Sequence, residues 1–171
     1  MSALTEARIQ DAIWGQFSTR SELIIPNFRA PNWHECDVFQ VAKSLYWVEF
    51  EIKISVSDFR ADFNKEAKHA TLKAGDSLLG PRRFWYVMPT DIAEKVKADI
   101  PAYAGLMIAK DIDGYVRLRV VKKAPTLKSA KLTAEYVVRR YETFMWRYWT
   151  LRGDFRRLVK RYTDEKGEES K

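Results

Sequence analysis

Apolar and polar residues alternate along residues 34–54, which is the pattern of a β-hairpin with one face in the core. Successive strand residues point to opposite faces, so each predicted strand has two different sets of side chains. On the second strand the apolar face consists of Tyr46, Val48, Phe50, Ile52 and Ile54, and the other consists of Trp47, Glu49, Glu51 and Lys53. On the first strand one face consists of Glu35, Asp37, Phe39 and Val41.

The register of this hairpin decides whether its acidic residues meet. We expect Val41 to pair either with Trp47 or with Leu45. The residue opposite Asp37 is then Glu51 or Glu49. Because the aromatic and branched residues on the same face need a covering layer, we expect these carboxylates at the rim of a covered face. The alternative is a solvated face of an amphipathic hairpin.

Carboxylates that converge at such a rim repel one another unless a proton or a cation joins them. A hard divalent cation with oxygen ligands, Mg²⁺ or Mn²⁺, resolves the conflict. Asp37 and Glu51 would hold it, helped by the Ile52 carbonyl, and Lys53 would position or help deprotonate a water. Such a metal polarises a phosphoryl oxygen and activates water. The pattern therefore predicts phosphodiester hydrolysis, with Asp37, Glu51 and Lys53 as catalytic residues.

Other charged residues are second-tier candidates. Glu35 and Glu49 are available as an additional metal ligand. Glu6, in the first turn of a predicted helix, is either an acid lent to the site or a partner of the helix dipole. The residues expected to hold nucleic-acid phosphates are Lys65, Lys68, His69, Arg82 and Arg83. For the first three of these, an ordinary solvated basic face is the alternative, and for Arg82 and Arg83 the alternative is capping of the loop before the next strand.

The rest of the first 125 residues predicts helices and strands around the hairpin. Apolar spacing of four predicts a helix over residues 3–17, and a proline-containing loop is expected over 18–33. A helix is expected from an N-cap at Ser57 to about Lys73, with an inner stripe of Phe59, Phe63, Ala67 and Ala70. Residues 84–88 predict a buried strand, and Asp113-Gly114 predicts the turn of a second hairpin.

A long helix is expected from Ser129 onwards, because its apolar residues recur at alternating spacings of four and three. This heptad seam consists of Val137, Tyr141, Phe144, Tyr148, Leu151, Phe155, Leu158 and Tyr162. We expect a domain division into a core (1–125), a basic and aromatic helix that packs on it (126–163) and a charged tail (164–171). The arginine-rich second half of the helix is a candidate contact with a second copy, as a homodimer, or with DNA.

Composition narrows the class of protein. A chain of 171 residues with 46% hydrophobic residues is expected to form a folded domain with a sizeable core. Its 30 Lys and Arg against 23 Asp and Glu give a net charge of +7, which suits a polyanionic partner. The single Cys36 excludes an internal disulfide and a cysteine-rich zinc site. The sequence has no secretory signal and no apolar run that could span a bilayer, so we expect a cytoplasmic protein without membrane contact.

Asp37 followed by Glu51-Ile52-Lys53 resembles the signature of the PD-(D/E)XK nuclease superfamily. The run EIKISVSDFRADFNKEAKHATL, followed by RRFWYVMP, is similar to MmcB-like DNA-repair proteins and related phage-encoded proteins. The resemblance covers about residues 1–125. It implies an α/β fold with a central mixed sheet flanked by helices, as in restriction endonucleases, a metal on the aspartate and the glutamate, and DNA as substrate. Two positions depart from the pattern: Cys36 stands where a proline is usual, and Lys68-His69 stands where related sequences favour Lys-Trp.

These observations predict a metal-dependent DNA nuclease of the repair, recombination or phage type. The first alternative is a protein with a nuclease fold that binds DNA but does not cleave it. The second is a phage protein that binds a host protein through its long helix.

Overall fold

The structure of the protein is a computed structural model that describes the backbone of residues 4–30 and 32–168 and the side chains up to residue 163. The chain divides into two compact units, residues 1–132 and 133–171. Each is compact in itself, and the predicted packing of the C-terminal helix on the core stays a prediction.

A six-stranded sheet forms the centre of the first unit, with its strands in sequence order from β1 to β6. The strands are β1 (Ser21–Arg29), β2 (Glu35–Ala42), β3 (Trp47–Ile52), β4 (Arg83–Pro89), β5 (Ala104–Ile112) and β6 (Tyr115–Lys122). The central pairs β3–β4 and β4–β5 are parallel, and the outer pairs are antiparallel. The sheet is therefore mixed, which confirms the predicted α/β class.

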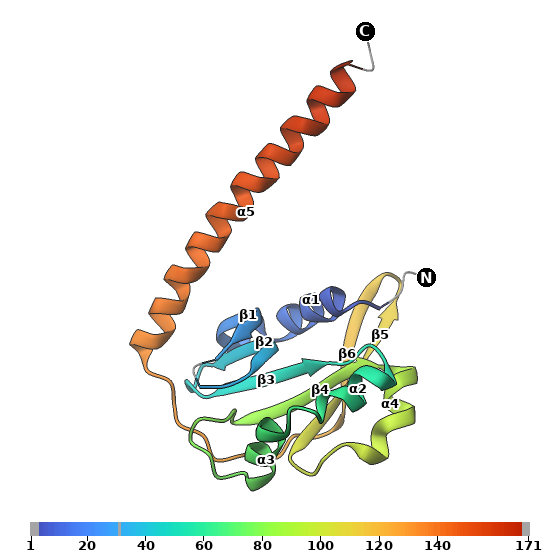
Figure 1. Cartoon of the computed structure of the whole chain (residues 1–171), viewed down its shortest axis with the longest axis vertical. Coiled ribbons are helices and arrows are strands. Elements are labelled where there is room, and N and C mark those ends of the chain that lie inside the picture. Colours follow the sequence, from blue (N-terminus) through green and yellow to red (C-terminus); the bar gives the residue numbers. More distant parts are fainter. Residues whose placement is uncertain (1–3, 31, 169–171) are drawn as a thin grey trace. The chain divides into compact units, whose positions relative to one another are not determined.

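Helices cover both faces of this sheet (Figure 1). They are α1 (Glu6–Phe17), α2 (Val56–Asp62), α3 (Glu66–Ala74) and α4 (Thr90–Val96), with short 3₁₀ turns at Ser18–Arg20 and Lys97–Asp99. Ile9 and Ile13 of α1 are fully buried in one apolar cluster, which includes Phe50 of β3. A second cluster on the other face joins Phe59 of α2 and Leu72 of α3 to the sheet. The carboxylates of β3 lie on this second face.

The loop predicted over residues 18–33 is wrong, because most of it is strand β1. Leu23 and Ile25 are buried at alternate positions, as in a strand with one face in the core. Pro26 is compatible with this assignment because β1 is an edge strand, where a missing N–H need not break a ladder. Pro31, the other proline of the predicted loop, lies outside the described residues.

The single helix predicted over residues 57–73 is also wrong, because two helices, α2 and α3, stand in its place. The N-cap is Ser55, whose side chain accepts from the Asp58 N–H at 3.0 Å. The chain leaves helical geometry after Asp62, so α3 starts with a new phase and turns Lys68, His69 and Leu72 inwards. Ala67 and Ala70, predicted to be inside, are exposed.

The second predicted hairpin is confirmed as β5–β6. Asp113 and Gly114 both have positive φ, 53° and 85°, which is the requirement of the tight turn that Asp-Gly favours.

The second unit contains α5 (Ala134–Glu168), a helix of 35 residues that begins five positions later than predicted. It continues through the described part of the predicted tail, residues 164–168, whereas 169–171 lie outside the described residues. Apolar side chains of α5 are exposed along most of its length. In the part of the chain that the structure describes, no helix has the length and apolar character to cross a membrane.

Candidate functional site

The hairpin register brings the predicted carboxylates together. Val41 pairs with Trp47 and Phe39 pairs with Glu49, so the same register places Asp37 across from Glu51. This confirms one of the two predicted registers. Asp37 Oδ2 accepts a hydrogen bond of 2.6 Å from the Ile52 N–H, which fixes its carboxylate against the backbone beside Glu51.

Three lysines surround the Glu51 carboxylate, which is 1% exposed. Lys53 and Lys65 donate to Oε1 at 2.9 and 2.8 Å, and Lys68 donates to Oε2 at 2.8 Å. Lys53 lies two residues beyond Glu51, directly after the end of β3, whereas the other two lysines lie at the start of α3 and within it. The negative charge of Glu51 is therefore fully compensated inside the protein.

Glu49 is completely buried and has two partners. Lys68 Nζ lies 2.7 Å from Oε1, and the indole N–H of Trp33 donates to Oε2 at 2.7 Å. Burial raises the pKa of Glu49, and the charge of Lys68 opposes this rise. Burial would also lower the pKa of Lys68, but the charges of Glu49 and Glu51 hold that pKa well above its ordinary value. Lys68 is thus a buried cation shared by two glutamates.

Asp62, at the end of α2, is a third buried carboxylate of the cluster. Tyr86 donates to its Oδ2 at 2.8 Å, and Lys65 Nζ lies 3.0 Å from its Oδ1. His69 Nε2 lies 3.2 Å from Oδ2, while His69 Nδ1 lies 2.7 Å from the Tyr103 hydroxyl. Burial would raise the pKa of Asp62, but the hydrogen bond with His69 and the charge of Lys68 outweigh it and hold the pKa far below its usual range.

Asp37 differs from the other carboxylates of the cluster. Among the described residues, no lysine or arginine forms an ion pair with it. Burial and the charge of Glu51 raise its pKa to about 7, although the Ile52 N–H and Lys53 oppose the rise. Near neutral pH this carboxyl group is therefore divided between its protonated and ionised forms.

Glu6 of α1 lies close to this carboxyl group. Gln10 donates to the Glu6 carboxylate at 3.1 Å and to the Asp37 carbonyl at 3.1 Å. The charge of Glu6 also contributes to the raised pKa of Asp37. Glu6 also lies in the first turn of α1, where it faces the positive end of the helix dipole, so both interpretations of Glu6 stay predictions.

The predicted phosphate-binding residues differ in whether they are buried or exposed. Lys68 and His69 are buried within the carboxylate cluster, where they cannot contact a solvent-borne phosphate. Arg82 donates to the Leu127 carbonyl at 2.9 Å and lies over the Tyr46 ring. The positions that reach the surface are Arg83, which is exposed, and Lys65, whose side chain is 40% exposed. The second-tier acid Glu35 is exposed as well.

Sequence reasoning missed Asp62, Trp33 and Tyr86. A signal for the first was present, because Asp58, Asp62, Lys65 and Lys68 recur at spacings of four and three. This charged stripe looks like a solvated face unless the buried glutamates opposite it are known. No local signal marks Trp33 or Tyr86, since their partners lie 16 and 24 residues away.

The donor set for a metal is small. In the described part of the chain, no group of three or more His, Cys, Asp and Glu side chains is arranged to hold a metal ion. Asp37 and Glu51 are two carboxylates, and Mg²⁺ in proteins commonly uses one or two carboxylates and keeps several waters. The raised pKa of Asp37 fits a cation at this position. Glu51 fits as a ligand once one of its ammonium partners moves.

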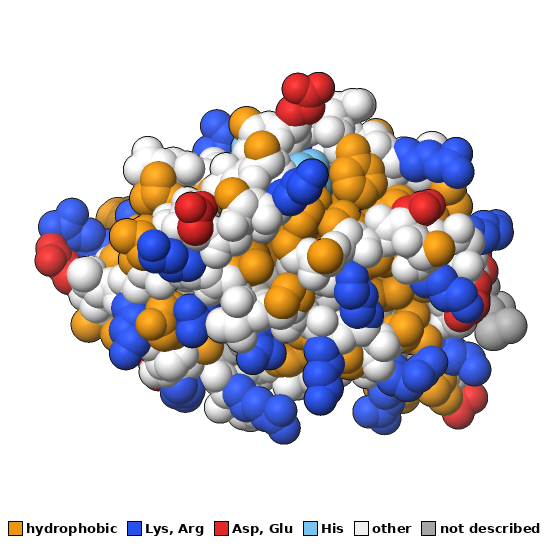
Figure 2. Space-filling view, turned by 90° about the horizontal axis from the view of Figure 1, so that it is seen from below, with side chains coloured by type: hydrophobic (Ala, Val, Ile, Leu, Met, Phe, Trp, Pro, Cys, Tyr) orange, Lys and Arg blue, Asp and Glu red, His pale blue; other side chains and the backbone are white. Residues whose placement is uncertain are grey.

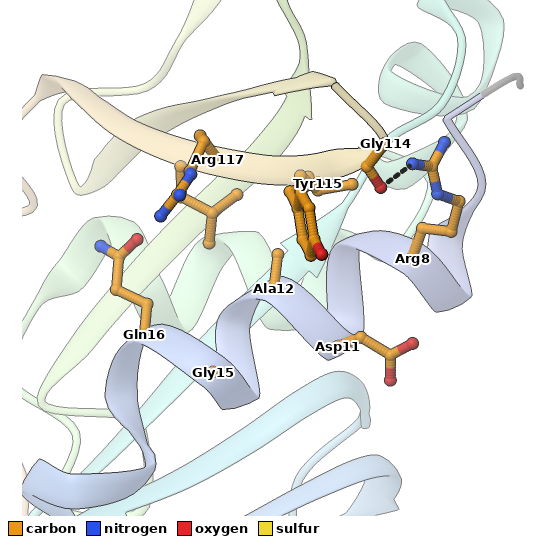
Figure 3. Close-up of a pocket in the computed structure, with 10 residues that line it drawn as sticks. Arg8, Asp11, Ala12, Gly15, Gln16, Gly114, Tyr115 and Arg117 are labelled. Carbon is orange, nitrogen blue, oxygen red and sulfur yellow. Dashed lines mark hydrogen bonds between the residues drawn. The ribbon is translucent and has the colours of Figure 1, made fainter. Parts of the chain in front are cut away.

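A cavity of about 630 Å³ lies elsewhere, between α1 and the β6 end of the sheet. Figure 3 shows Gln16 and Ala12 of α1 facing Tyr115 and Arg117 of β6. Arg8 at one end donates to the Gly114 carbonyl at 3.0 Å. None of the predicted catalytic residues lines this cavity, so it is separate from the carboxylate cluster.

No protein-family model matches the sequence, and no curated protein matches it. The chain is similar in structure to a protein of unknown function from Silicibacter pomeroyi, with a TM-score of 0.59 and 18% sequence identity. The match covers 87% of this chain and 91% of that one. At this level of identity the similarity concerns the fold alone.

Proposed function

We propose that the protein is a Mg²⁺- or Mn²⁺-dependent DNA nuclease of the PD-(D/E)XK class, acting in the cytoplasm in DNA repair, recombination or phage biology. The observation that carries the proposal is the hairpin register that places Asp37 across from Glu51, with its carboxylate held by the Ile52 N–H at 2.6 Å and its pKa raised to about 7 by burial and by the charge of Glu51. The metal ligands would be Asp37, Glu51 and the Ile52 carbonyl. The Ile52 N–H points to Asp37, and the carbonyl of a strand residue points to the same neighbouring strand as its N–H.

The bound metal would supply polarisation of the phosphoryl oxygen and an activated water. Lys53 contacts Glu51 at 2.9 Å and is buried, so its ammonium group is held in place. It would orient the attacking water and offset the negative charge that develops on the phosphate. Both contributions are needed because phosphodiester hydrolysis is slow, and its barrier must fall by up to ~20 kcal/mol or more.

Lys65 is the ammonium partner of Glu51 that can leave most easily. Its side chain is 40% exposed, whereas Lys53 and Lys68 are buried. A DNA phosphate that approaches the cluster offers Lys65 an alternative anion. If Lys65 moves to the phosphate, Glu51 Oε1 loses one of its two donors and becomes available to a cation. Arrival of the substrate and loading of the metal would then be coupled.

The charge of the surface supports a polyanionic substrate. Lys and Arg side chains are spread over the face shown in Figure 2, with few acidic side chains among them. The chain has a net charge of +7, and several of its acidic side chains are buried in the carboxylate cluster, so they do not contribute to the surface. Exposed basic side chains are therefore available for phosphate contacts, which supply most of the sequence-independent affinity for DNA.

A second candidate function is DNA binding without turnover. The observation that favours it is the saturation of Glu51 by three lysines, which balances its charge without a metal. In this case Lys65 would still contact phosphate, and Asp37 would bind a proton rather than a cation.

The test is a panel of labelled duplex, flapped and single-stranded DNA, incubated with Mg²⁺, Mn²⁺ or EDTA. The proposal expects cleavage that needs the metal and falls by about 100-fold or more in Asp37→Asn and in Lys53→Met. The exposed Asp76→Asn serves as the matched control and should cleave normally. Activity that persists in both site variants contradicts the proposal.

Calorimetric titration with Mn²⁺ separates the two candidates without relying on turnover. The nuclease proposal expects binding that is lost in Asp37→Asn and strengthened in Lys65→Met, because the competing ammonium is gone. The second candidate expects no Mn²⁺ binding in the wild type or in either variant. It also expects DNA binding that is unchanged when EDTA is added.

A further inference from the structure

We propose that α5 pairs with α5 of a second copy of this chain as an antiparallel two-stranded coiled coil. The inference starts from an apolar seam whose side chains are largely exposed. Leu151 is 68% exposed, Phe155 is 66% exposed, and Tyr141, Tyr148 and Leu158 are each about half exposed. Val137, at the start of the seam, is buried. An apolar stripe of this length on a soluble protein marks an interaction surface.

The helix also needs a partner for its own stability. Most helical stability in proteins comes from packing of an apolar face. Gly153 lies in the interior of α5 and weakens it further. A helix of 35 residues with this composition is therefore expected to be held by contacts along its seam.

The spacing of the seam indicates that the partner is another helix. A straight helix drifts by about 20° per heptad relative to a strict seven-residue repeat, so a seam that keeps the repeat follows a supercoiled partner. A membrane surface or a nucleic acid imposes no such period. The repeat is kept from Tyr141 to Tyr162 without interruption.

The sizes of the seam residues favour a second copy in antiparallel orientation. Two antiparallel copies can be aligned so that their twofold axis passes between residues 149 and 150. Every seam residue of one copy then faces a seam residue of the other copy. The inner layers are then Tyr141 with Leu158, Phe144 with Phe155, and Tyr148 with Leu151. Two of these three layers combine an aromatic with an aliphatic side chain. A parallel pair would instead place each tyrosine and each phenylalanine against its own copy, which fills the interface unevenly.

The charges beside the seam favour the same orientation. In the antiparallel pair, Arg147 of each copy lies beside Asp154 of the other, which gives two attractive contacts at the centre. In the parallel pair, Arg147 would lie beside Arg152 of the other copy, which gives two repulsive contacts. The antiparallel pair has like charges only near its ends, where Arg140 approaches Arg161.

The helix as a whole is basic, and this predicts how the pairing responds to salt. Residues 134–163 contain eight Lys and Arg and three Asp and Glu, so their net charge is 8 − 3 = +5. Salt screens the repulsion between two such helices and leaves the apolar contacts intact. Pairing should therefore strengthen as salt is added, whereas binding of a nucleic acid to the same helix would weaken.

Sedimentation velocity of the full chain over a range of protein and salt concentrations tests the proposal. The wild-type protein should form a dimer that tightens with salt. The double variant Tyr148→Glu, Leu151→Glu removes the central layer and should sediment as a monomer. The matched control is Trp146→Glu, a residue of α5 that is 77% exposed and lies outside the seam, and it should remain a dimer. Circular dichroism should show that Trp146→Glu keeps its helix content, whereas the monomeric double variant loses part of it, because α5 then lacks the contacts along its seam.

A charge exchange tests the orientation. Arg147→Asp and Asp154→Arg should each weaken the dimer by about tenfold, because two attractive contacts become repulsive. The combination of both changes should restore it. A parallel pair predicts the opposite for Arg147→Asp, which would then meet Arg152 and tighten the dimer. The proposal would be overturned if the wild-type protein were a monomer at every concentration, or if the central double variant still formed the dimer. It would also be overturned if Arg147→Asp tightened the dimer.

Discussion

The two units of this chain depart from the usual arrangement of side chains in opposite ways. The core unit buries charged groups, with Glu49, Glu51 and Lys68 all less than 2% exposed. The α5 unit exposes large apolar groups, with Trp146 at 77% and Leu151 at 68%. Soluble proteins normally place charged residues outside and large apolar residues inside.

The difference lies in whether each departure is compensated within the chain. In the core, three lysines and a tryptophan N–H contact the buried glutamates, and Asp37 is the carboxylate of the cluster that forms no ion pair among the described residues. In α5, the seam side chains of Tyr148, Leu151, Phe155 and Leu158 are all more than half exposed. The core therefore compensates its buried charges largely within the chain, whereas the apolar side chains of α5 stay exposed.

The largest effect is expected when the compensation in the core is broken. Lys68→Met leaves two buried glutamates without their shared cation, and breaking a buried ion pair costs about 3–5 kcal/mol. Urea unfolding should show this loss in the free energy of unfolding. The matched control is Lys65→Met, which removes a 40% exposed ammonium group from the same Glu51 and should cost less than about 1 kcal/mol. Equal losses in the two variants would show that the cluster is hydrated.

A smaller effect is expected at the neutral donor of the cluster. Trp33→Phe removes the indole N–H that lies 2.7 Å from the buried Glu49 Oε2. The loss of a hydrogen bond to a charged group costs about 1.5–3 kcal/mol. Thermal or urea unfolding measures the change, with the exposed Trp14→Phe as control. No difference between the two variants would mean that water replaces the indole.

Strand and helix patterns predicted the sheet well where burial is one-sided. The β2–β3 register and the Asp113-Gly114 turn followed from alternation and turn chemistry. The edge strand β1 was missed because Pro26 was interpreted as a loop residue, although an edge position tolerates it. Local pattern alone does not show where a strand lies within a sheet.

The candidate site was predicted in part for a related reason. Asp37, Glu51 and Lys53 lie within one hairpin, so a short-range pattern could group them. The inward direction of Lys68 could not be predicted from its own helix, because its apolar neighbours Ala67 and Ala70 suggested the other face. Burial of this lysine depends on carboxylates of β3, which are distant in sequence. Compensated buried charge is a tertiary property.

The pH dependence of stability tests whether Asp37 is the uncompensated group of the core. Burial and Glu51 raise its pKa in the folded state from 3.8 to about 7, so the folded state holds the proton more tightly than the unfolded state. Stability from this group is present below the unfolded pKa and is lost as the pH rises through about 7. The slope can reach about 1.4 kcal/mol per pH unit between the two values.

Asp37→Asn cannot titrate, so its free energy of unfolding should fall less steeply between pH 4 and 7 in urea titrations. The pKa of Glu49 is also raised by burial, and it leaves a residual slope of the same sign in the variant. Asp111→Asn is the control with the opposite sign, because the hydrogen bond from Arg8 lowers the pKa of Asp111 and its contribution is lost as the pH falls. Identical slopes in wild type and Asp37→Asn would remove the basis for a cation at this position.

The smallest effect concerns the independence of the two units and uses a matched pair of glycines. Gly153 in α5 and Gly15 in α1 are both helical, and an added Cβ meets no atom closer than 3.9 Å at either site. Alanine stabilises a helix interior by about 1 kcal/mol relative to glycine. Because α1 packs on the sheet, Gly15→Ala should raise the melting temperature of the core, followed by near-ultraviolet circular dichroism. Gly153→Ala should leave that transition in place and raise only the melting of α5, followed at 222 nm together with dimer dissociation. If both variants shift one common transition, the core and α5 unfold as one cooperative unit, and the contrast between them concerns packing within a single domain.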